Sequence, residues 1–138
     1  MTPQQISLVK NSWKHFRKIE PMAVGDLFYS HLIHKNPSLK SVFKFSLERQ
    51  SKLLFDFLST IITRLDKIHD LEDDIRLVAA TYAGYGVLPQ HYEMIRTALL
   101  WTLEKGLEKD WTPEIADAWL TGSIEVMHIM QASMSKKP

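Results

Sequence analysis

Apolar residues recur at spacings of three and four along nearly the whole chain, which is the period that places side chains on one face of an α-helix. The first such stretch begins after Thr2, which together with Gln5 has the sequence of a capping box. Its apolar face is formed by Ile6, Val9, Trp13 and Phe16. No segment alternates apolar and polar residues with a period of two. The pattern therefore predicts helices and no strands.

Proline, asparagine and glycine divide the remaining periodic sequence into separate helices. A second helix is expected from about Pro21 to the residue before Asn36, followed by a short helical turn through Leu39, Val42 and Phe43. The others are a long helix from about Ser46 to Lys67, one from about Leu71 to Ala83 that Gly84 and Gly86 end, one opened by Pro89, and one opened by Thr112 and Pro113. The pattern predicts a single all-α domain over residues 1–138, with six to seven helices.

Composition narrows the classes of protein to which the chain can belong. It has 17 basic and 16 acidic residues, a net charge of +1 that gives no electrostatic footprint for nucleic acid. It has no apolar run long enough to span a membrane, and no cysteine for a disulfide, a thiolate metal site or a thioether-linked cofactor. No catalytic sequence motif is present. We expect a cytoplasmic, non-enzymatic protein that binds neither nucleic acid nor membranes.

Tyr82 is the residue whose chemistry needs an explanation, because it falls on the inward face of its helix. One interpretation is a core aromatic side chain with its hydroxyl bonded to a polar group. The other is a tyrosinate ligand of a metal ion. A free phenol ionises near pH ~10, so a phenolate needs a cation or the metal beside it. The helical neighbours three and four positions away (Val78, Ala79, Tyr85 and Gly86) are not basic. We expect no metal site, with Tyr82 as the alternative ligand.

Five short motifs, in this order along the chain, resemble the globin family over roughly residues 4 to 132. They are "NSWKHF", "GDLFYSHLI", "NPSLKSVF", "YGVLPQHY" and "WTPEIADAW". The likeness is greatest to bacterial single-domain globins and to the globin part of flavohaemoglobins. The resemblance implies a globin fold with a pocket for a tetrapyrrole.

The sequence departs from the family pattern at the position of the iron ligand. In these globins a histidine stands three residues before the tyrosine of "YGV", and here that position is Tyr82. The distal position, where family members carry histidine or glutamine, aligns with Arg49, or with Gln50 if the register shifts by one. The chain thus resembles haem-less globins associated with bilin biosynthesis.

The resemblance also implies which residues contact the bound group. Arg49 and Lys52 would hold the carboxylates of the bound group. The alternative is that they are simply exposed to solvent at the start of their helix. Asp56 either lies at the boundary of the apolar face or accepts hydrogen bonds from the pyrrole N–H groups that a metal-free tetrapyrrole has. By resemblance His91 would lie at the pocket edge. The complete candidate set is Tyr29, Phe43, Arg49, Lys52, Leu53, Asp56, Tyr82, Tyr85, Val87, His91, Tyr92 and Ile95.

Three functions follow from this interpretation. The first is non-covalent binding of a linear tetrapyrrole, a bilin, in the former haem pocket. The second is binding of haem b with Tyr82 as axial ligand, for redox sensing or haem handling. The third is a ligand-free sensor or partner-binding domain, with a homodimer through the last two helices as the expected assembly. Without a ligand, we expect Tyr82, Phe45 and Phe55 to fill part of the pocket.

Overall fold

The computed structural model describes residues 1–135, and the side chains of residues 1–132. Within this part of the chain every regular element is a helix, which confirms the predicted all-α fold. The elements are α1 (Pro3–Phe16), α2 (Pro21–Lys35), η1 (Pro37–Ser41), α3 (Leu47–Thr63), η2 (Leu65–Leu71), α4 (Glu72–Tyr85), α5 (His91–Leu107), η3 (Glu108–Asp110) and α6 (Pro113–Ser135), where η marks a 3-10 helix. None of the described helices is long and apolar enough to cross a membrane.

The start of α1 has the capping box that the sequence predicted. The Gln5 backbone N–H donates to Thr2 Oγ1 at 3.1 Å, and the Thr2 N–H donates to Gln5 Oε1 at 2.9 Å. The start of α5 differs from the prediction, because the helix begins at His91 and not at Pro89. The His91 N–H donates to the Leu88 carbonyl at 2.9 Å, so Pro89 lies in a tight turn before the helix.

Two helix ends also differ from the prediction. α3 stops at Thr63, and the chain continues as η2 with a kink at Lys67, whose φ is −130° and ψ is 47°. α4 runs through Gly84 and ends at Tyr85. Gly86 caps it with a φ of 102°, in the left-handed region that glycine adopts without a Cβ clash. Of the two glycines expected to end this helix, only Gly86 does so.

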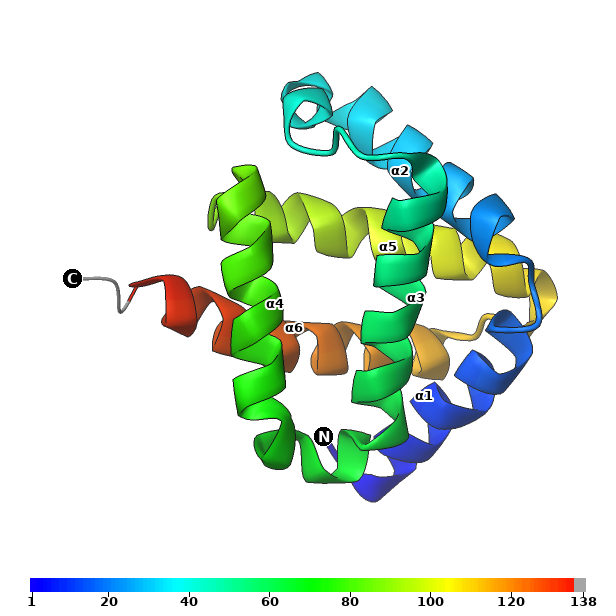
Figure 1. Ribbon diagram of the computed structural model, residues 1–138. Helices are drawn as coiled ribbons and strands as arrows, with labels where there is room; N and C mark the ends of the chain where they lie inside the picture. The colour runs from blue at the N-terminus through cyan, green and yellow to red at the C-terminus, as the bar shows by residue number, and fades with distance from the viewer. Residues whose placement is uncertain (136–138) are drawn as a thin grey trace.

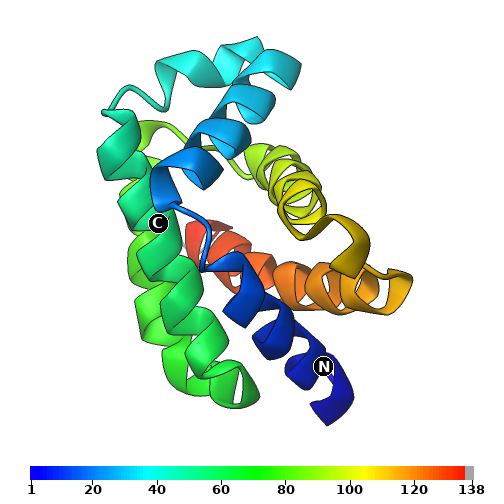
Figure 2. The same cartoon turned by 90° about the vertical axis from the view of Figure 1, so that its right-hand side faces the viewer.

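The helices cross one another in two layers around a central space. In Figure 1, α3 and α4 run side by side in the front with a gap between their ribbons, and α5 and α6 cross behind them. Figure 2 shows the same two groups edge-on, with α1 and α2 joining them. The closest packing is of α2 on α3 and α5, and of α6 on α1 and α4. Side chains of α3 and α4, such as Leu58 and Tyr82, line one cavity inside the fold.

An aromatic cluster joins α1, α3 and α6 beside that space. The Trp13 ring lies 5.5 Å from Phe55 and 6.4 Å from Trp119, centroid to centroid. Phe16 stacks on Phe55 at 6.3 Å. The expectation that Phe55 fills the ligand pocket is therefore wrong: its ring is part of the core against α1.

Candidate functional site

A cavity of about 110 Å³ lies between the two layers, with lining residues from each of the helices α1 to α6. Five of the residues predicted for the site come together there, from segments far apart in the sequence. They are Tyr29, Phe43, Tyr82, Tyr92 and Ile95. The structure supports their grouping, and their part in binding a ligand remains a prediction.

Three predicted residues of α3, Lys52, Leu53 and Asp56, do not line this cavity. Lys52 and Asp56 are exposed, and 40% of the Leu53 surface is exposed. The buried stripe of α3 runs through Leu54 and Leu58 instead, so the wide apolar face read from the sequence included the solvent edge of the helix. The expectation that Asp56 reaches a group inside the cavity is not met in this structure.

The predicted residues near the start of α3 and from Tyr85 to His91 do not line the cavity either. Arg49 is exposed, with its guanidinium carbon 4.5 Å from the centre of the Phe45 ring. Tyr85 packs on Phe45 at 4.8 Å, and Val87 is buried without lining the cavity. His91 uses Nδ1 to accept a hydrogen bond from the Leu88 N–H at 2.9 Å.

The distal register can be followed in the structure. Gln50 is buried and its side-chain amide donates to the Phe45 carbonyl at 2.6 Å, whereas Arg49 faces outward. The Gln50 carbonyl accepts the Tyr29 hydroxyl at 3.2 Å. Neither Arg49 nor Gln50 lines the cavity. Of the two distal candidates, Gln50 is therefore the inward one; its side-chain N–H is bonded to the Phe45 carbonyl and its backbone carbonyl to the Tyr29 hydroxyl.

Aromatic rings occupy much of the space between α2 and α4. Phe43 and Tyr82 meet edge to face, with centroids 6.5 Å apart and an interplanar angle of 69°. Tyr29 lies 5.4 Å from Phe43 on one side, and Tyr85 lies 6.3 Å from Tyr82 on the other. These separations are those of rings in direct contact. The Tyr82 ring thus fills part of the space beside the cavity, as expected of it.

The hydroxyl groups of this site are neutral phenols at physiological pH. Burial, with smaller contributions from Tyr85 and Tyr92, raises the pKa of Tyr82 from 10.0 to about 12. Burial also raises the pKa of Tyr29, to which Tyr82 contributes, and the pKa of Tyr92. No charged side chain and no histidine is among the described residues that line the cavity.

Metal-ligating side chains do not gather elsewhere in the described part of the chain. No group of three or more His, Asp or Glu residues is close enough to hold an ion there. His31 stacks on Trp101 with ring centroids 3.8 Å apart. Burial lowers the pKa of His31, and Lys35 and His34 lower it further. Tyr82 remains the candidate axial ligand.

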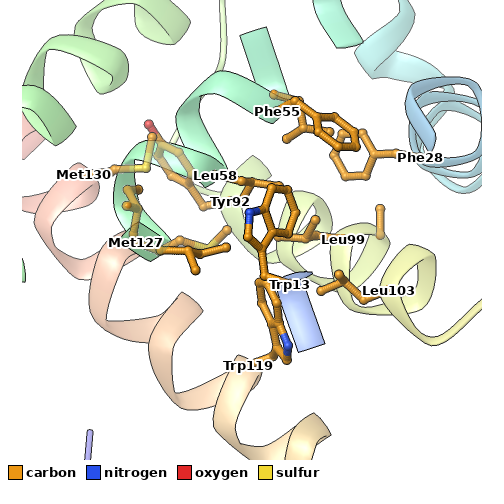
Figure 3. Close-up of a cluster of buried hydrophobic side chains, with 14 of the residues drawn as sticks. Trp13, Phe28, Phe55, Leu58, Tyr92, Leu99, Leu103, Trp119, Met127 and Met130 are labelled. Atoms are coloured by element: carbon orange, nitrogen blue, oxygen red, sulfur yellow. The ribbon is translucent and has the colours of Figure 1, made fainter. Parts of the chain in front are cut away.

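The wall formed by α6 was not predicted as part of the site. Trp119, Ser123, Met127 and Met130 line the cavity from this helix. Figure 3 shows Met127 and Met130 on one side of Tyr92, with Trp119 below Trp13. Helical periodicity marks several of these residues as inward-facing, and it contains no signal that separates a cavity wall from ordinary core.

Comparisons with known proteins agree with the fold. The Globin family profile matches residues 26–130. A flavohemoprotein of Vibrio cholerae is 25% identical over 122 residues, which cover 86% of this chain and 31% of that protein. A neuroglobin of Tetraodon nigroviridis is 25% identical over 144 residues, covering 94% of this chain and 87% of that protein.

A solved structure shows the same arrangement of helices. The hexacoordinated heme protein of an anhydrobiotic tardigrade superposes with a TM-score of 0.88 at 14% identity, covering 99% of this chain and 96% of that one. The chain spans about a third of the length of the flavohemoprotein that it matches. Because the family profile covers most of the chain and the helices superpose, the chain belongs to the globin family.

Proposed function

We propose that this globin binds haem b without enzymatic activity, and that Tyr82 is the axial ligand of the iron. The observation that carries the proposal is the position of Tyr82, which lines the apolar cavity in contact with Phe43. Two of the similar proteins described above are named as haem proteins. Haem would supply an iron that accepts an anionic oxygen ligand, and a phenolate is one such ligand.

The residues at the site fit this group in their chemistry. A bound cation favours the deprotonated form of a ligand, so iron would offset the effect of burial on the Tyr82 phenol. Arg49 and Lys52 are exposed at the start of α3, and neither forms an ion pair in the described part of the chain. They are the cations that would meet carboxylates at the rim.

The cavity volume is smaller than a haem requires. Pockets for drug-sized ligands have volumes of ~300–1,000 Å³, and the present cavity has about 110 Å³. A macrocycle therefore enters only if the rings of Phe43 and Tyr82 separate. The proposal includes this opening, with the cost of the lost ring contact offset by burial of the macrocycle.

Bilin binding is the second candidate. It is favoured by the absence of a histidine or a cation among the described cavity-lining residues, because a metal-free tetrapyrrole needs neither. Asp56 was expected to accept hydrogen bonds from the bilin N–H groups, but its side chain is exposed and does not line the cavity. We rank bilin binding below haem binding for that reason.

Two preparations distinguish these functions: the chain expressed with a haem supply, and the chain expressed with a bilin-producing pathway. A Soret band that collapses in Tyr82→Phe supports the proposal. Tyr85→Phe is the matched control, because Tyr85 contacts Tyr82 and Phe45 without lining the cavity. A red-absorbing band that survives Tyr82→Phe supports the bilin candidate. No chromophore in either preparation overturns both and leaves a ligand-free globin.

A further inference from the structure

Tyr92 carries a polar group that the fold leaves unused. Only 2% of its surface is exposed, and its hydroxyl has no hydrogen-bond partner among the described residues. Leaving a buried donor unsatisfied costs about 1–3 kcal/mol, so such groups usually have a partner. The residue lines the cavity, and Figure 3 shows its oxygen end turned toward Met130. The missing partner is therefore expected inside the cavity.

The other hydroxyls at the cavity differ from this one. The Tyr29 hydroxyl donates to the Gln50 carbonyl at 3.2 Å, and the Ser123 hydroxyl donates to the Leu120 carbonyl at 2.8 Å. Tyr82 is half-buried and its hydroxyl makes no hydrogen bond within the described residues. Tyr92 is thus the fully buried donor that faces the cavity without a bond.

The remaining walls determine the chemistry of what can fill the space. They are apolar side chains of α1, α3, α5 and α6, such as Val9, Leu58, Ile61, Leu99 and Met127. An ion would lose its hydration without gaining a counter-charge there. A buried water molecule needs about three hydrogen bonds, and this wall offers few polar groups. The cavity therefore suits a neutral, mostly apolar molecule.

The volume sets the size of that molecule. An apolar cavity of ~150 Å³ holds a benzene molecule, so the present cavity of about 110 Å³ admits a molecule of that size only if the flexible methionine side chains on its wall move. Methionine side chains adapt to irregular ligands, and Met127 and Met130 form one side of the space. We propose that the cavity binds a small cyclic carbonyl compound, whose oxygen accepts the Tyr92 hydroxyl while its ring lies against the two methionines.

The test uses the full chain purified without haem, so it does not rest on haem binding. Cyclopentanone and its hydrocarbon analogue cyclopentane are titrated against protein with ¹³C-labelled methionine methyls. We expect both to shift the Met127 and Met130 signals. Tyr92→Phe should lower the affinity for cyclopentanone about fivefold, which is equivalent to the loss of a net hydrogen bond of about 1 kcal/mol. Cyclopentane binding should stay unchanged. Ser51→Ala removes the other buried hydroxyl that has no partner among the described residues, and because Ser51 does not line the cavity, this change should alter neither titration.

Three results would overturn the proposal: no shift of either methionine with either probe, equal weakening of both probes in Tyr92→Phe, or full cyclopentanone affinity in that variant. If Tyr92→Phe does not fold, ¹³C-labelled tyrosine in the unaltered chain gives a second reading. The Tyr92 ring carbon that bears the hydroxyl should shift with cyclopentanone and not with cyclopentane. Its failure to do so would equally contradict the hydrogen bond.

Discussion

The rings of Phe43 and Tyr82 meet edge to face, with centroids 6.5 Å apart. The contact joins the segment after η1 to α4, and both rings line the cavity. Since this is also where a tetrapyrrole would enter, the contact links the stability of the empty protein to its capacity for a ligand. The two properties should respond to mutation in opposite directions.

Phe43→Ala should lower stability and speed haem uptake. Fully buried Phe→Ala changes cost ~3–5 kcal/mol, and the half-buried Phe43 should cost less. Haem should associate faster because the ring that must move is gone. Denaturant unfolding measures the first effect and stopped-flow absorbance the second. Phe45→Ala is the control, because Phe45 contacts Tyr85 and Arg49 outside the cavity; equal uptake rates in both variants would contradict the role of Phe43.

Gly25 permits the close crossing of α2 over α3. A Cβ at this position would lie 2.6 Å from Ser51 Cβ and 3.3 Å from Ser51 Cα, so Gly25→Ala must push the helices apart. We expect Gly25→Ala to lower the free energy of unfolding by about 1–3 kcal/mol, as other substitutions that overpack a core do. Gly84→Ala is the matched control within α4, where an added Cβ meets nothing within 4 Å. That change should stabilise the protein by about 0.5–1 kcal/mol, since alanine is the better helix former. Thermal unfolding measures the stability change of both variants, and changes of the same sign in the two would contradict this explanation.

Ser12 and Trp119 hold α1 against α6 through a buried hydrogen bond. The Trp119 indole Nε1–H donates to Ser12 Oγ at 2.8 Å. Ser12→Ala leaves that N–H unsatisfied and should cost about 1–3 kcal/mol. Ser7→Ala, at an exposed position of the same helix, should change stability little. Chemical denaturation of the pair measures the difference, and equal midpoints would mean that the bond contributes nothing.

The buried tyrosines should make stability fall at alkaline pH. Because the pKa of Tyr82 is about 12 in the folded chain and 10.0 when unperturbed, the unfolded state loses this proton first as pH rises. The contribution is complete below pH 10 and is lost between about pH 10 and 12, with a slope of up to about 1.4 kcal/mol per pH unit for one proton. Tyr82→Phe should reduce the slope of unfolding free energy against pH. An unchanged slope would contradict the raised pKa.

The helices could be predicted from the sequence because their apolar stripes are strong and glycine or proline separates them. Their ends were less predictable, since the kink at Lys67 and the continuation through Gly84 depend on packing. In the site, Tyr29, Phe43 and Tyr82 were expected to converge and do. Leu53 and Asp56 were predicted to line the pocket but are exposed, because the apolar face of α3 is wider than the part of that helix that is buried. Within the described residues the Tyr92 hydroxyl has no hydrogen-bond partner, and no pattern in the sequence indicates this.

The most direct test of the account is the resonance Raman spectrum of the ferric haem complex, compared between the unaltered chain and Tyr82→Phe. If Tyr82 ligates the iron, the unaltered complex shows tyrosinate vibrations enhanced by the charge-transfer band, and Tyr82→Phe lacks them. Ligation also removes the phenol proton at neutral pH, despite the raised pKa of the free residue. A haem complex whose spectrum is the same in both proteins, or an unaltered chain that takes up no haem, would contradict the assignment of Tyr82.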